Sequence, residues 1–101
     1  MKPLGGVLTR ALRSLGLDRE VARASAMLAW PEAARAALGP AARGVVAARM
    51  DGSTLVVLVP SSSHAAEIRL REREILDALE ALAPASGVKR IRCAPSGGTS
   101  A

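Results

Sequence analysis

The apolar residues change their spacing along the chain, and the spacing predicts where helices and strands lie. Residues 4–15 repeat apolar side chains every three or four positions, which is typical of a short amphipathic helix. Gly16 is a natural stop for this helix, and Asp18 can cap a second one. Proline breaks a helix interior but fits the first turn of a helix. We therefore expect a kink or break at Trp30-Pro31 and a further helical segment that ends at Gly39-Pro40.

The second helix should bury one side against the core. Its apolar spacing predicts an inner stripe made of Val21, Ala24, Ser25 and Leu28. Trp30 is the only aromatic residue of the chain. We interpret it as a core anchor at the kink and not as a binding residue, because a large apolar ring contributes most when it is buried.

Two strands are expected in the middle of the chain. Val45–Met50 is followed by the turn Asp51-Gly52 and by Thr54–Val59, so the two segments should form an antiparallel hairpin. The second strand is apolar on both faces, which is typical of a central strand that is covered on both sides. Pro60 ends this strand, because proline has no N–H to donate to a neighbouring strand.

A long helix and a third strand complete the expected domain. The helix should begin at the serines Ser61–Ser63 and end at Leu82, with an apolar stripe formed by Ile68, Ile75, Leu79 and Leu82 and with His64 on the same side. Val88–Cys93 is the third strand, and a crossover of this length predicts that it runs parallel to Thr54–Val59. Residues 95–101 are rich in Gly, Ser and Thr, and we expect a disordered tail.

These elements predict one α+β domain over residues 1–94. Its order is α-α-β-β-α-β, with a small three-stranded mixed sheet backed by helices on one face. Its length is sufficient for a single core without cross-links.

The charge of the chain is concentrated in its first half. The formal net charge is +5; residues 1–49 hold eight basic and three acidic side chains, whereas residues 50–101 hold six of each. Arginine forks match phosphate and carboxylate oxygens, so the excess suits phosphate or acidic partners. Abundant Arg with abundant Ala can also reflect genomic base composition. If the excess binds nucleic acid, the candidate residues are Arg10, Arg13, Arg19, Arg23, Arg90 and Arg92.

The sequence argues against an enzyme. A single His and a single Cys form no zinc signature, and Ser61–Ser63 lack the flanking glycines of a nucleophile elbow. No glycine-rich phosphate loop precedes a helix. We therefore expect no metal, no cofactor and no small-molecule substrate. No apolar run is long enough to span a bilayer or to form a signal-peptide core, so we expect a soluble cytoplasmic protein with no membrane partner.

Five features taken together resemble one bacterial family. They are Trp30 followed by Gly39, a hairpin with glycine at its turn, the strand Leu55-Val56-Val57, the run Ser61–Ile68 and the strand Val88–Arg92. In this order and spacing they resemble the DciA family over residues 4–94. The resemblance implies a type II KH-like fold and a partner, the DnaB-type replicative helicase, which these proteins help to place on DNA.

The chain departs from the family pattern at several points. His64 stands where the family usually has an aromatic residue, and the gap from Trp30 to Gly39 is longer than usual. Only residues 95–101 stand where many members carry a long basic tail, so any DNA contact must come from the domain or its first helix. No GxxG loop is present, which argues against KH-style clamping of RNA.

Three functions remain open from the sequence. The first is a replication factor that binds the helicase and, weakly and without sequence preference, DNA, preferably single-stranded. The second is a KH-like RNA-binding or ribosome-associated module. The third is a pure protein-interaction or homodimer domain in which the basic charge is incidental.

Overall fold

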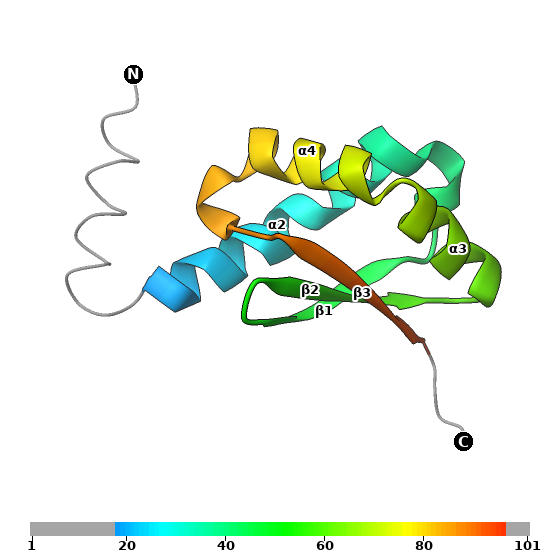
Figure 1. Cartoon of the computed structure of the whole chain (residues 1–101), viewed down its shortest axis with the longest axis horizontal. Coiled ribbons are helices and arrows are strands. Elements are labelled where there is room, and N and C mark those ends of the chain that lie inside the picture. The colour runs from blue at the N-terminus through cyan, green and yellow to red at the C-terminus, as the bar shows by residue number, and fades with distance from the viewer. Residues whose placement is uncertain (1–17, 97–101) are drawn as a thin grey trace.

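Three strands form a mixed sheet in the order β1-β2-β3, and the helices lie on one face of it (Figure 1). The structure is a computed structural model that describes residues 18–96. Its elements are α2 (Asp18–Leu38), the 3₁₀ turn η1 (Gly39–Ala42), β1 (Val46–Asp51), β2 (Thr54–Val59), α3 (Ser62–Leu70), α4 (Glu72–Leu82), the 3₁₀ turn η2 (Pro84–Ser86) and β3 (Arg90–Pro95). The expected α+β class and mixed sheet are confirmed. The helix expected over residues 4–15 and residues 97–101 of the expected tail lie outside the described residues. The expected start of the tail at residue 95 is wrong, because Pro95 pairs with Val59 in β3 and the Ser96 N–H donates to the Val59 carbonyl oxygen (2.9 Å).

The strand pairing follows the prediction. β1 is antiparallel to β2, with Asp51 opposite Thr54, and the two-residue turn between them places Gly52 at φ +61°. β2 is parallel to β3, with Thr54 opposite Arg90. β1 and β3 begin one and two residues later than expected and also end later. A bulge at Ala48 shifts the register between Ala47 and Arg49.

The core lies between the sheet and the helices. Its largest fully buried side chains are Trp30, Leu55, Ile68, Ile75, Leu79 and Val57. Trp30 is 1 % exposed, and its ring N–H donates a hydrogen bond to the Val45 carbonyl oxygen (3.2 Å). The indole therefore joins the middle of α2 to the chain just before β1, which confirms its interpretation as a core anchor. Leu82, by contrast, is 45 % exposed, so the expected stripe of the last helix does not extend that far into the core.

Of the kink or break predicted at Trp30-Pro31, the break does not occur. α2 continues through Pro31 for 21 residues. A proline inside a helix removes one backbone hydrogen bond and crowds the preceding turn. Here one continuous stripe is buried on both sides of Pro31, consisting of Ala26, Trp30, Ala33, Ala34 and Leu38. The packing of that stripe offsets the local penalty, and a break would misalign its two halves.

The inner face expected for α2 is also wrong. Leu28 is 82 % exposed and Ala24 is exposed, whereas Ala26 and Trp30 are buried. At 100° per residue, the buried face lies almost half a turn away from the expected stripe. Alanine carries a weak apolar signal, so the larger side chains Val21 and Leu28 dominated the sequence pattern.

The long helix expected up to Leu82 is two helices. α3 ends at Leu70 and α4 begins at Glu72, because Arg71 leaves the helical region (φ −109°, ψ 21°). The apolar spacing of Ile68, Ile75 and Leu79 is the same for one helix or two, so periodicity could not detect the break. After the turn, a Glu72 carboxylate oxygen accepts a hydrogen bond from the Ile91 N–H (2.9 Å), which ties the start of α4 to β3.

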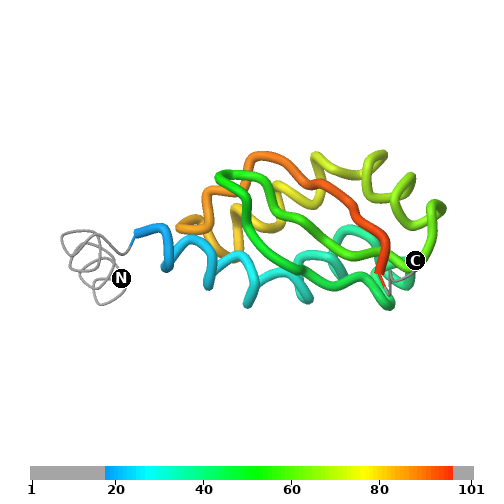
Figure 2. Tube along the Cα trace, turned by 90° about the horizontal axis from the view of Figure 1, so that it is seen from below, coloured from blue at the N-terminus to red at the C-terminus, as the bar shows by residue number. Residues whose placement is uncertain are grey.

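The second face of β2 has no helix over it among the described residues, contrary to the expectation of a strand covered on both sides. Figure 2 views the sheet from this side. Val56 is nevertheless only 1 % exposed. Its neighbours across the sheet are Arg49 on β1 and Arg92 on β3, so arginine side chains cover this position instead of a helix.

Candidate nucleic-acid interface

The described basic candidates of the sequence gather at one end of the molecule. Arg19 and Arg23, in the first turns of α2, line a surface depression together with Met50 and Gly52 of the β-hairpin. α2 and the hairpin tip therefore meet at this end, as Figure 1 shows. Two segments more than 25 residues apart in sequence thus contribute to one surface.

β3 begins at the same end. The N–H groups of Lys89 and Arg90 both point to the Ser53 carbonyl oxygen, at 2.8 and 3.3 Å. The hairpin-end surface is defined here as Arg19, Arg23, Arg49, Lys89, Arg90 and Arg92, with the acidic residues Glu20 and Asp51 among them. Six basic and two acidic side chains give it a strong local excess of positive charge.

Two of these arginines are held in place by one carboxylate. Asp51 accepts hydrogen bonds from Arg49 (3.3 Å) and Arg92 (3.0 Å), which approach it from the two strands on either side of β2. The three groups form a bridge over Val56. Exposed ion pairs of this kind contribute little stability, but the bridge restricts two guanidinium groups that keep further N–H donors for a ligand.

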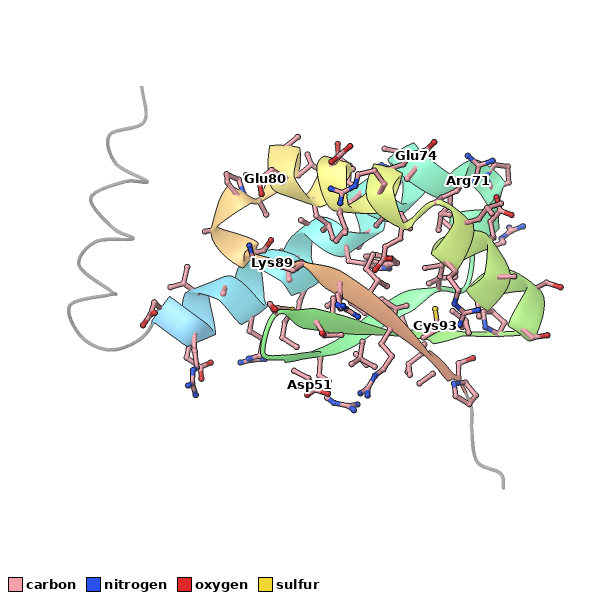
Figure 3. All side chains as sticks on the ribbon, in the orientation of Figure 1. Asp51, Arg71, Glu74, Glu80, Lys89 and Cys93 are labelled. Atoms are coloured by element: carbon pink, nitrogen blue, oxygen red, sulfur yellow. The ribbon has the colours of Figure 1, made fainter. Side chains whose placement is uncertain are left out.

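The other basic residues of this end are less constrained. Arg23 pairs with Glu20 within α2 (3.0 Å). Among residues 18–96, Arg19, Lys89 and Arg90 make no ion pair. Their charges are exposed, so they are the strongest candidates for contact with phosphate oxygens. Figure 3 shows Lys89 and Asp51 at this end of the molecule.

The charged face of α3 and α4 has a different character. Arg71 donates to Glu67 (2.5 Å) and Glu74 (3.3 Å), and Arg73 pairs with Asp77 (3.6 Å). Figure 3 labels Arg71 and Glu74 on this face. The hydrogen bond with Glu67 raises the pKa of Arg71 above its usual value. The pairs Arg71–Glu67 and Arg73–Asp77 each join residues four positions apart, and this face neutralises itself.

The structure thus brings together Arg19, Arg23, Arg90 and Arg92, whereas Arg10 and Arg13 lie outside the described residues. Sequence reasoning did not single out Arg49 and Lys89. The turn could have located Arg49, because counting back from a two-residue turn places it opposite Val56 and beside Arg92. Lys89 precedes β3, and only the contact with Ser53 shows where it lies.

The surface offers phosphate contacts but no means of reading bases. Trp30, the only Trp, Tyr or Phe residue of the chain, is buried, so no side chain of these three types is available to stack on a base. Contacts to phosphate position a nucleic acid without carrying sequence information. The arrangement therefore suits sequence-independent binding.

The two residues with the most reactive side chains do not form a chemical site. His64 is half-buried beside Ser61, and Cys93 lies in β3, where burial raises the pKa of its thiol above the usual value. A raised pKa lowers the thiolate fraction and hence the reactivity. Within residues 18–96, no group of three or more His, Cys, Asp or Glu side chains could hold a metal ion. None of the helices in that range could cross a membrane.

Ser61 and His64 begin α3. The Ser61 hydroxyl accepts a hydrogen bond from the His64 backbone N–H (3.3 Å) and lies 2.8 Å from Nδ1 of the His64 ring. Ser61 is therefore the N-cap that the sequence predicted, and the ring supports the cap.

Replacing His64 with Phe should change the free energy of unfolding by less than replacing Ser61 with Ala, which should cost about 1 kcal/mol. The backbone bond to the hydroxyl survives in the His64 variant, and a larger apolar ring still packs at the start of α3. Urea denaturation of the two variants and the parent tests this order. A larger loss for His64→Phe would mean that the imidazole itself is needed.

One family model matches the chain. The model described as "Dna[CI] antecedent, DciA" matches residues 3–93, which include every helix of the described fold, both strands of the hairpin and most of β3. No curated protein matches the chain.

Proposed function

The chain belongs to the DciA family, and from this premise we propose that it binds the DnaB-type replicative helicase and assists its loading on DNA. The family is one of helicase loaders in DNA replication and not of enzymes. The observation that carries the proposal is the extent of the family match, residues 3–93. In bacteria this activity takes place in the cytoplasm, where the chromosome is replicated.

The hairpin-end surface supports a direct, weak contact with DNA. A factor that loads a helicase benefits from holding the strand near the helicase, and exposed Lys and Arg side chains do so through the phosphates. The surface runs from α2 across the hairpin to β3. A flexible single strand can follow these three elements, whereas a stiff duplex contacts fewer of them. We therefore expect single-stranded DNA to bind more tightly than duplex.

The two other functions have less support. An RNA-binding KH module would use a GxxG loop, and no two glycines of the chain have that spacing. Instead of glycines, the turn that joins α3 and α4 contains Arg71, whose side chain pairs with Glu67 and Glu74. A pure protein-interaction domain would leave the charge of the hairpin-end surface without a role.

Binding to the helicase is tested with purified proteins. The full chain is mixed with a DnaB-type hexamer, and complex formation is measured by analytical ultracentrifugation; loading is measured as unwinding of a forked DNA already coated with single-strand-binding protein. We expect a complex at micromolar concentration and faster unwinding. The absence of both would refute the proposed function.

A variant in which Lys89 and Arg90 are both replaced with Gln distinguishes the contact with the helicase from the contact with DNA. If the helicase binds elsewhere, this variant should keep the complex in the absence of DNA and lose part of the stimulation of unwinding. Loss of the complex itself would instead assign the hairpin-end surface to the helicase.

A further inference from the structure

Helix α2 has apolar residues on the side that faces away from its buried stripe. Val21, which is half-buried, and Leu28 lie there, almost half a turn from the stripe that contains Ala26 and Trp30. Leu28 is 82 % exposed. A fully exposed leucine on its own needs no explanation, but a contiguous apolar surface indicates a contact.

The exposed face continues into a groove at the end of α4. The groove is lined by Ser25, Leu28, Ala29 and Glu32 of α2 and by Leu82, Ala83, Pro84 and Ala85 from the end of α4 and from η2. Leu82, which is 45 % exposed, faces it from the far side. The walls are thus two helix segments, and a third helix is the natural shape to fill the space between them.

The sequence supplies such a helix directly before α2. Residues 4–15 carry an apolar stripe formed by Leu4, Val7, Leu8, Ala11, Leu12 and Leu15. A helix of 12 residues is only marginally stable alone in water, so its apolar face needs a partner. The exposed apolar side of α2 also lacks a packing partner. Only two residues, Gly16 and Leu17, connect the two segments.

The short connection and the length of the segment are compatible with docking along α2. A two-residue loop between helices makes them antiparallel neighbours. Leu28 lies about 15 Å along α2 from Asp18, and a helix over residues 4–15 is about 18 Å long. Folded back on α2, with Leu15 level with Asp18, the segment would place Gly5 level with Leu28, with Leu4 and Leu8 within one turn of it.

We propose that the groove between α2 and the end of α4 binds residues 4–15 of the same chain as a helix antiparallel to α2. Tethering by two residues gives the segment a high effective concentration, which no separate partner shares. Arg10 and Arg13 lie opposite the apolar stripe, so docking leaves both exposed.

Amide hydrogen exchange of the full chain tests the docking. We expect the amides of residues 8–15 to exchange slowly in the parent. Replacing Leu28 with Gln should speed their exchange by about 10- to 100-fold, because the groove loses its main apolar contact. Leu8→Gln should have the same effect from the other side.

Leu70 provides a matched control, since it is 80 % exposed and lies at the end of α3, away from the groove. Leu70→Gln should leave the exchange of residues 8–15 unchanged. Rapid exchange in the parent, or equal effects of Leu28→Gln and Leu70→Gln, would overturn the proposal. Protection that grows with protein concentration and accompanies a dimer would assign the groove to a second copy instead.

These readouts do not depend on the helicase or on DNA. If residues 4–15 do not dock, the proposed function is unaffected. If the chain does not bind the helicase, the docking proposal is unaffected.

Discussion

Replacing Trp30 with alanine should lower the free energy of unfolding by about 3–5 kcal/mol, a large part of the stability of a domain of this size. Trp30 is the largest buried side chain and 1 % exposed, so its removal leaves a cavity between α2 and the sheet. The variant also leaves the Val45 carbonyl oxygen without its indole donor. Denaturation with urea or heat, followed by circular dichroism, measures the loss.

Replacing Trp30 with Phe distinguishes the contribution of the apolar ring to stability from that of the hydrogen bond. Trp30→Phe keeps most of the apolar volume but removes the donor to Val45, and it should cost about 1–3 kcal/mol. A loss below about 1 kcal/mol for Trp30→Ala would show that the surrounding alanines collapse into the space.

Neutralising three exposed basic residues of the hairpin-end surface should abolish most of the DNA binding. We expect about three to five phosphate contacts, so a fourfold rise in salt should lower the affinity of the parent for single-stranded DNA by about 20- to 130-fold. The combined variant Arg19→Gln, Lys89→Gln and Arg90→Gln should bind about tenfold or more weakly and reduce the salt slope by about two units. Fluorescence anisotropy over a salt series measures both quantities.

The matched control removes the same charge from other surfaces. Arg35, Arg43 and Arg73 are exposed and lie outside the hairpin-end surface. Changing them together to Gln should preserve most of the affinity and the salt slope. Equal losses in the two triple variants would mean that binding follows net charge and not this surface. Unchanged binding in the first variant would place the contact on Arg10 and Arg13 or show that the charge is incidental.

The hairpin and its partner strand were predictable because their signals are local. Gly52 permits the tight turn, and the turn then fixes which residues of β1 and β2 stand opposite one another. The crossover from β2 to β3 has one favoured hand, so the parallel pairing also followed from chain order. The N-cap at Ser61 was predictable for the same reason, since a hydroxyl at that point serves the helix that follows it.

The helices were harder to predict, because the features that were missed depend on contacts between residues that are far apart in the sequence. Nothing near Pro31 in sequence indicates that Trp30, Ala33 and Ala34 share one buried stripe across the proline. Nothing near Arg71 indicates that Glu72 has a partner in β3, 19 residues later. Local propensity is a weak signal compared with burial, and burial is decided by elements that are remote along the chain.

The fold class, the strand pairing, the family and the excess of positive charge follow from the amino-acid sequence. These depend on residue types, on their spacing and on turns that close over a few residues. The buried face of α2, the division of the last helix and the grouping of basic residues on one surface depend instead on how the elements pack together. Arg49, Arg92 and Asp51 meet because two strands flank β2, and Arg19 joins them because α2 starts beside the hairpin. A surface of this kind is set by how the elements pack, and that packing results from the whole core and not from any one segment.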